Sequence, residues 1–184
     1  MAVPPRTLVL VRHAKAESLG SLGDSKRVLA PRGRRQAAAL GPMLVRMVGP
    51  FDRALVSSAL RTRETYRLLA GDSDAYPRPR VMDELYQASA RQLLGILQRL
   101  DEKDRRVLVV GHEPTMSTLA YMLHDARDAM SEEMSRGIPT STACIIDVPV
   151  AWSELDRNRA HVREVVRPSR QKGRASGEAV DEKS

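Results

Sequence analysis

The sequence predicts a three-layer α/β/α sandwich around a mainly parallel central sheet. Two short runs, residues 7–12 and 106–111, are rich in Val and Leu and stop at polar residues, which is typical of buried parallel strands. Further strand-like runs alternate with stretches of helical apolar spacing, and this alternation indicates an α/β fold. No internal repeat or linker divides the chain. We therefore expect one domain over residues 1–167 and a disordered polar tail over residues 168–184.

The remaining elements have their own start and stop signals. Pro31 opens a helical pattern that runs through about Val48, and Gly49-Pro50 ends it. Gly and Ser residues predict a loop over 17–25, and Pro, Gly and Asp residues make 71–80 irregular. Pro114 has the position of a first-turn proline in a following helix. The other predicted elements are strands at 53–58, 81–82, 144–150 and 161–166, and helices from the end of the 53–58 strand to about 70 and over 89–101.

The composition narrows the class of function. The chain has 184 residues, a formal net charge of +7 and a sequence pI near 10.1. Its positive charge is spread along the chain, so we expect phosphorylated substrates or acidic partner proteins and no specific nucleic-acid binding. Aromatic residues make up only 3%, which argues against stacking platforms for single-stranded nucleic acid.

The cysteine count and the lack of long apolar runs indicate the compartment. Cys144 is the only cysteine, so an intramolecular disulfide and a CxxC site are excluded, and its apolar neighbours predict a packed thiol. The sequence has no run long enough to span a membrane and no signal-peptide pattern, so we expect a cytoplasmic protein without membrane association. The oligomeric state is not set by any sequence feature.

Basic residues and histidines follow three of the predicted strands. Arg12 and His13 follow the first strand, His112 follows the strand at 106–111, and Arg61 lies just beyond the strand at 53–58. Ligand sites in open α/β sheets lie outside the carboxyl ends of the strands, so we expect these four side chains to converge. One arginine guanidinium can bind two oxygens of a phosphate or carboxylate at once, in a bidentate arrangement. A histidine can attack phosphorus when one ring nitrogen is neutral and the other is held by a backbone carbonyl. The pattern indicates chemistry on an anion.

Three motifs in order resemble those of a known family. They are Arg12-His13-Ala14, the stretch Ser58–Thr65, and Gly111-His112-Glu113-Pro114. Together they resemble the signatures of the histidine phosphatase, or phosphoglycerate-mutase-like, superfamily over about residues 7–150. The run from Arg12 through Ala37 is most similar to the small SixA-like phosphohistidine phosphatases. This resemblance implies a phosphoglycerate-mutase-like fold, and the short stretch between Arg61 and Glu84 leaves no room for a large cap domain.

The resemblance also implies a role for each site residue. His13 would be the nucleophile that forms a transient phosphohistidine, while Arg12, Arg61 and His112 would bind the phosphoryl group. No metal or other cofactor is implied. Glu84 matches the acidic proton donor of some family members, whereas SixA-like members often have no obvious donor, and both alternatives remain open. The expected substrate is a phosphohistidine carried by a protein.

Two other functions are compatible with the same residues. The site could act on small phosphoesters or nucleotides, which is the alternative within phosphatase chemistry. A non-catalytic phosphate-binding or adapter protein is the alternative of another class. Asp24 lies in the loop after the first strand, where it could shape the site, pair with Arg27 or cap the following helix.

Overall fold

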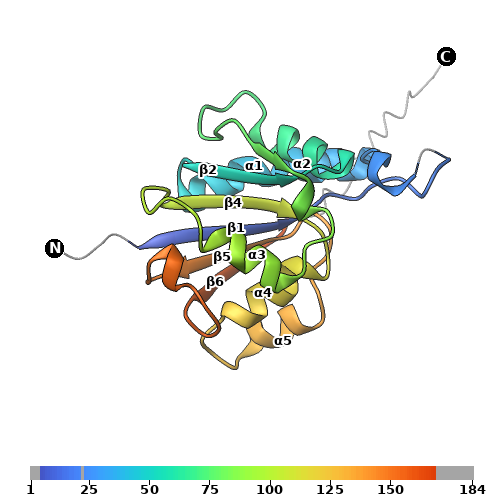
Figure 1. Cartoon of the computed structure of the whole chain (residues 1–184). Helices are drawn as coiled ribbons and strands as arrows, with labels where there is room; N and C mark the ends of the chain where they lie inside the picture. The colour runs from blue at the N-terminus through green and yellow to red at the C-terminus, as the bar shows by residue number, and fades with distance from the viewer. Residues whose placement is uncertain (1–4, 22, 169–184) are drawn as a thin grey trace, which may run out of the picture.

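The computed structural model describes residues 5–21 and 23–168, so the predicted tail, except its first residue, lies outside the described part. Six strands form one sheet in the order β3-β2-β4-β1-β5-β6 (Figure 1). β3, β2, β4 and β1 are parallel neighbours, whereas β5 is antiparallel to β1, and β6 to β5. The strands are β1 (Arg6–Arg12), β2 (Arg53–Ser57), β3 (Arg80–Met82), β4 (Arg106–Gly111), β5 (Ala143–Val148) and β6 (His161–Val166).

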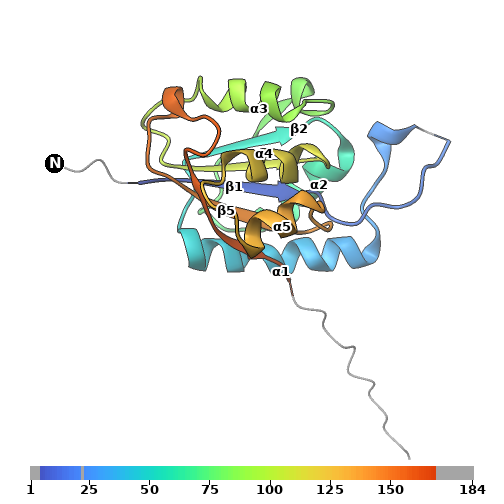
Figure 2. The ribbon, with the colours of Figure 1, turned by 90° about the horizontal axis from the view of Figure 1, so that it is seen from below.

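Helices cover both faces of this sheet (Figure 2). One face is covered by α1 and α2, the other by α3 and α4, and α5 packs against α4 and β6. The helices are α1 (Pro31–Val48), α2 (Leu60–Ala70), α3 (Ala90–Leu97), α4 (Thr115–Leu123) and α5 (Ala129–Ser135), with short 3₁₀ helices η1 (Asp24–Lys26), η2 (Asp83–Leu85) and η3 (Trp152–Glu154). The predicted α/β/α sandwich with a mainly parallel sheet is confirmed. Among the described residues, no helix is both long and apolar enough to cross a membrane.

The central strand β1 supplies both apolar cores. Leu8 and Leu10 pack with α3 and α4, while Val9 and Val11 pack with α1 and α2. All four side chains are fully buried. Successive side chains of a strand point to opposite faces, so a continuous apolar run is what a strand covered on both sides requires.

Two glycines of α1 allow close packing that any larger residue would obstruct. A Cβ on Gly41 would lie 2.0 Å from the carbonyl oxygen of Leu69 in α2, so these two helices touch through their backbones. A Cβ on Gly33 would lie 2.1 Å from the carbonyl oxygen of Lys15, in the segment that follows β1. The glycines therefore bring α1 against both α2 and the loop that leaves the first strand.

Several element boundaries differ from the sequence prediction, and α3, β5 and α4 are the clearest cases. Helix α3 ends at Leu97, not 101, because the chain continues in tighter turns, with the Leu100 N–H bonded to the Leu97 carbonyl. β5 ends at Val148, two residues early, and α4 begins one residue after Pro114, its N-cap. Helix α5 was not predicted at all, since it has only seven residues and buries only Ser131 and Met134.

Candidate active site

Three parallel strands deliver the predicted residues to one edge of the sheet. The carboxyl ends of β1, β2 and β4 lie at the same edge (Figure 1). Arg12 is paired with Gly111 in the β1–β4 register, so the next residues, His13 and His112, emerge side by side. Their ring centroids are 5.2 Å apart. Arg61, in the first turn of α2, bonds to both rings, and thus the expected convergence is present.

The His13 ring is held so that its Nε2 is unprotonated. Its Nδ1 lies 2.8 Å from the carbonyl oxygen of Ala14, which can only accept, so Nδ1 carries the proton. Nε2 then has its lone pair exposed toward Arg61, whose Nε donates to it at 3.3 Å. Burial, together with the charges of Arg61 and Arg12, lowers the pKa of His13 to about 4. The ring is therefore neutral near pH 7, as an attacking nitrogen requires.

Thr65 fixes the peptide that orients His13. Its Oγ1 accepts the backbone N–H of Ala14 at 2.9 Å and donates to the Arg61 carbonyl at 2.6 Å. Both Thr65 and Ala14 are fully buried. The first residues after β1 are thereby tied to the helix that carries Arg61.

His112 has the opposite tautomer. Arg61 donates from Nη2 to His112 Nδ1 at 3.3 Å, so Nδ1 accepts and Nε2 carries the proton. Nε2 lies 2.8 Å from Oγ of the buried Ser57 at the end of β2. Burial, with the neighbouring His13 and Arg61, lowers the pKa of His112 to about 3. The two histidines thus have different nitrogens facing the guanidinium of Arg61.

Arg61 is the central side chain of the cluster, with only 6% of its surface exposed. Besides the two histidines, it bonds to Asp24 twice, through Nη1 to the carbonyl oxygen at 2.8 Å and through Nη2 to Oδ2 at 2.9 Å. The ring of Tyr86 lies 5.8 Å from its guanidinium carbon. A buried arginine with this many partners has one orientation, and its positive charge faces Nε2 of His13.

Asp24 connects the loop after β1 to the site. The carboxylate accepts from Arg27 at 2.9 Å and from the Tyr86 hydroxyl at 2.7 Å, in addition to Arg61. These bonds, the one from Tyr86 above all, hold the pKa of Asp24 well below its usual range. Of the three roles considered for Asp24, the structure shows two at once, namely shaping the site and pairing with Arg27. Gly23 and Ala30 occupy the N-cap positions of the neighbouring helices, so Asp24 does not cap.

Arg12 is oriented from the opposite side by the segment before β5. Its Nη1 donates to the carbonyl oxygen of Ile138 at 2.6 Å. Glu113, which is half-buried in the motif after β4, accepts from the Ser117 hydroxyl at 2.5 Å. Burial raises the pKa of Glu113. The Arg12 guanidinium is thus held by the Ile138 carbonyl.

Comparison with known proteins agrees with this geometry. A sequence model of the histidine phosphatase superfamily (branch 1) matches residues 8–85. The chain is 33% identical over 149 residues to an uncharacterized Mycobacterium tuberculosis protein, Rv1276c, covering 79% of this chain and 92% of the relative. It is 30% identical to SixA of Nakamurella multipartitia, a candidate phosphohistidine phosphatase, with a TM-score of 0.80 over 91% of this chain and 99% of the other. The chain belongs to the SixA-like branch of the histidine phosphatase superfamily.

More distant structures share the fold of this histidine phosphatase. A SixA protein histidine phosphatase solved with tungstate superposes with a TM-score of 0.72 at 23% identity, covering 88% of this chain and 97% of that one. The predicted phosphoglycerate-mutase-like fold is confirmed.

Glu84 is the predicted site residue that this phosphatase does not bond into the cluster. It lies in η2, is exposed, and makes no hydrogen bond or ion pair with any residue that the structure describes. Two residues later, Tyr86 reaches the site with its hydroxyl on Asp24 and its ring 5.6 Å from that of His112. The donor role of Glu84 therefore stays a prediction.

Four contributors to the cluster were not singled out from the sequence. They are Ser57, Thr65, Tyr86 and the Ile138 carbonyl. Thr65 is the last residue of the second motif and Ser57 directly precedes it, so their positions on either side of Arg61 were a usable signal. Nothing local marks Ile138, which is 126 residues from its partner Arg12.

Within the described ranges, one group of side chains could offer ligands to a metal: His124, Asp125 and His161. It lies at the opposite end of α4 from His112. Both ring nitrogens of His124 already have partners, since Nδ1 accepts the Val162 N–H at 3.0 Å and Nε2 contacts Asp128 at 3.2 Å. This group is part of the packing between α4 and β6, and it is separate from the cluster around His13.

Proposed function

We propose that this chain is a metal-independent, cytoplasmic phosphatase that acts through a covalent phosphohistidine on His13, with a phosphohistidine on a protein as its substrate. The observation that carries the proposal is the His13 ring, which is neutral, with Nδ1 bonded to Ala14 and an unprotonated Nε2 that accepts from Arg61. The basic surroundings favour an anion at this position. Arg12, Arg61 and His112 are the groups we assign to the phosphoryl oxygens.

The proposed reaction has two displacements at phosphorus. In the first, the lone pair of His13 Nε2 forms a bond to phosphorus while the bond from phosphorus to the substrate imidazole breaks, and the leaving nitrogen keeps the electron pair and takes up a proton. In the second, water attacks phosphorus, the bond to Nε2 breaks, and inorganic phosphate leaves. The negative charge of a bound phosphoryl group offsets the positive charge of Arg61, which lowers the pKa of His112. The bound group therefore favours a proton on Nδ1 of His112, and that nitrogen can then donate to a phosphoryl oxygen.

The acid–base state of the site supports an imidazole as the leaving group. Asp24 is the carboxyl bonded to Arg61, and its lowered pKa keeps it ionised, so it has no proton to donate near pH 7. Glu84 is exposed and outside the cluster. An imidazole, with a pKa of about 6.5, leaves much more easily than an alkoxide. A phosphohistidine therefore suits this site better than an alkyl phosphate.

The test compares two substrates in chelator-treated buffer. Wild type, His13→Ala and the control His161→Ala would be assayed on a histidine-phosphorylated carrier protein and on an aryl phosphate. His161 is an exposed histidine on β6, so its removal controls for the loss of an imidazole elsewhere. We expect wild type and His161→Ala to dephosphorylate the carrier, and His13→Ala to be inactive. Rapid quenching should trap an acid-labile phosphoenzyme only when His13 is present.

The alternatives have distinct outcomes in the same experiment. Turnover of the aryl phosphate alone would shift the substrate to small phosphoesters and favour Glu84 as a proton donor. Phosphate binding with no turnover of either substrate would favour a non-catalytic phosphate-binding or adapter protein. Activity that requires added divalent metal, or that survives in His13→Ala, would contradict the proposed mechanism.

A further inference from the structure

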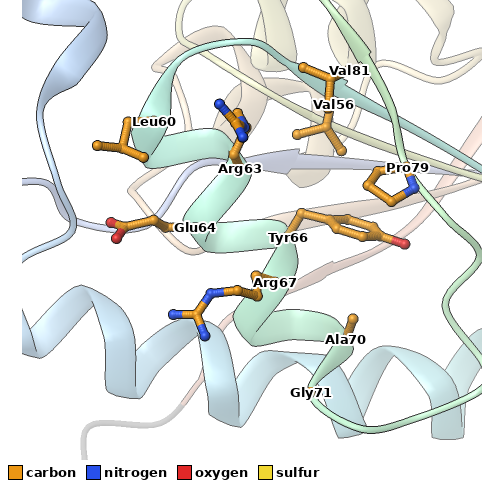
Figure 3. A pocket seen from close by; sticks show the side chains of 10 residues that line it. All are labelled: Val56, Leu60, Arg63, Glu64, Tyr66, Arg67, Ala70, Gly71, Pro79 and Val81. Atoms are coloured by element: carbon orange, nitrogen blue, oxygen red, sulfur yellow. The ribbon is translucent and has the colours of Figure 1, made fainter.

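A second surface feature begins one residue from Arg61. It is a groove of about 560 Å³ between helix α2 and the edge strand β3, which we call the α2–β3 groove (Figure 3). Ten residues line it: Val56, Leu60, Arg63, Glu64, Tyr66, Arg67, Ala70, Gly71, Pro79 and Val81. None of them belongs to the cluster around His13. The groove and the catalytic arginine share one helix, so a molecule that reaches both is held in a defined orientation.

The floor of the groove is apolar. Val56 and Val81 face the helix, and Pro79 lies opposite the Tyr66 ring (Figure 3). Val81 is 47% exposed, one of the few large apolar side chains at the surface of the described residues. It lies on β3, which has three residues and is the last strand at its side of the sheet. An apolar floor at an uncovered sheet edge is typical of an interaction surface.

The rim of the groove carries arginine side chains that form no ion pair with any described residue. Arg63 and Arg67, both on α2, line the groove. Both side chains are exposed, and within the described part of the chain neither side chain makes a hydrogen bond or an ion pair. The lining carboxylate, Glu64, points away from the floor (Figure 3) and accepts from the Leu29 N–H and from Arg34.

Some other arginines of this basic chain have acidic partners. Arg53 is paired with Asp104, and Arg163 with Asp147, at N–O distances of 2.8 and 3.0 Å. Arg63 and Arg67 have no such partner among the described residues, and they are the arginines that line the groove. Asp72 and Asp74 follow Gly71, at the end of α2 that is farther from Arg61.

We propose that the α2–β3 groove docks an acidic segment of the phosphorylated protein substrate, with apolar side chains of that segment on the floor and its carboxylates on the rim arginines. The inference rests on the proposed function and specifies its substrate as a protein with an acidic, partly apolar surface beside the phosphohistidine. Helix α2 has 11 residues, a length of about 16 Å at 1.5 Å per residue. An occupant that extends from the phosphoryl site along this helix is longer than a small phosphoester.

The experiment separates docking from catalysis by using two substrates that share the same leaving group. One is a histidine-phosphorylated carrier domain of net negative charge, and the other is free phosphohistidine, which is too small to reach the groove. The variant is Arg63→Glu/Arg67→Glu. The control is Arg157→Glu/Arg159→Glu, which makes the same charge change at two exposed arginines in the loop before β6, the opposite edge strand. Arg63→Gln/Arg67→Gln is a milder second variant for the case that charge reversal impairs folding.

We expect charge reversal at the groove to raise KM for the carrier by about tenfold, since each attractive surface contact becomes repulsive. The Gln variant should raise it by about threefold. KM and kcat for free phosphohistidine should be unchanged in all variants, and the control should match wild type on both substrates.

The possible failures are distinguishable. If wild type hydrolyses neither substrate, the proposed function itself is wrong. If wild type hydrolyses both and the groove variants retain the wild-type KM for the carrier, the docking inference is wrong while the function stands. An equal loss on both substrates, or an equal loss in the Arg157/Arg159 control, would also overturn docking at this groove.

Discussion

Replacing Thr65 by Val should loosen the segment that orients His13. Thr65 Oγ1 is the partner of the buried Ala14 N–H, and the Ala14 carbonyl in turn accepts from His13 Nδ1. Val has nearly the shape of Thr but no hydroxyl, so the Ala14 N–H would lose its acceptor. The Arg61 carbonyl, which also accepts from Thr65, keeps the backbone bond of the helix.

The magnitude follows from the burial of these groups. Ala14 is fully buried, so leaving its N–H without a partner should cost about 1–3 kcal/mol in the free energy of unfolding. Thr65→Ser is the matched control, because it keeps the hydroxyl and removes one methyl group at a cost of about 1 kcal/mol. Because a small misplacement of a reacting group can lower the rate strongly, we expect kcat of Thr65→Val to fall by about tenfold. Thr65→Ser should remain within about twofold of wild type.

The assay combines urea unfolding with kcat on free phosphohistidine. The diagnostic result is a large loss of kcat in Thr65→Val with near wild-type kcat in Thr65→Ser. If both variants had the same kcat, the Thr65–Ala14 bond would have no part in orienting His13, and the reasoning would be refuted. Equal stability of Thr65→Val and wild type would likewise show that the Ala14 N–H finds another partner.

Three further predictions concern charge, packing and reactivity. The pKa of His13 is lowered to about 4 from 6.5, so between pH 4 and 6.5 the unfolded chain binds more protons than the folded chain. The free energy of unfolding should therefore fall as the pH drops from 6.5 toward 4, by at most about 1.4 kcal/mol per pH unit for this histidine. Urea midpoints at pH 7 and 5 test this, and the dependence should weaken in His13→Asn; an unchanged dependence would contradict the assignment. Gly41→Ala should destabilise the fold by about 1–3 kcal/mol, because its Cβ would lie 2.0 Å from the Leu69 carbonyl oxygen. The control Gly95→Ala should stabilise the fold by about 0.5–1 kcal/mol, because only the end of the Arg99 side chain is nearby, at 3.7 Å. Equal shifts of the melting temperature in the two variants would refute the close approach of α1 and α2. Burial raises the pKa of Cys144 to about 12, so iodoacetamide at pH 8 should alkylate it only in the unfolded protein, and rapid labelling of the native protein would show that the thiol is accessible.

The arginines of this protein lie in two different environments. For this reason the net charge alone does not show whether the arginines bind a phosphoryl group or face a partner protein. Arg12 and Arg61 are held by backbone carbonyls and by Asp24 at the sheet edge, in a place suited to one phosphoryl group. Arg63 and Arg67, on the same helix as Arg61, are exposed and without partners among the described residues. The spacing along α2 separates the two sets, since residues 61 and 63 point to different sides of a helix.

The sequence by itself determined the elements whose signals are local. Val and Leu runs ending at Arg12, Ser57 and Gly111 predict buried strands, and the residues that follow such strands must meet at one edge of a parallel sheet. The convergence of Arg12, His13, Arg61 and His112 was therefore predictable, as was the buried state of Cys144. The length of α3 and the existence of α5 were not, because short helices bury few residues and have little periodicity.

Only the tertiary structure decided which groups orient that set. The Asp24–Arg61 bonds, the Tyr86 hydroxyl on Asp24 and the Ile138 carbonyl on Arg12 join residues 37, 62 and 126 positions apart. Such contacts leave no local pattern, because they depend on where separate loops lie after the sheet has formed. The same holds for the α2–β3 groove, which exists because β3 is an edge strand. Nearby residues determine a strand and its end, whereas hydrogen bonds between loops depend on the packing of the whole chain.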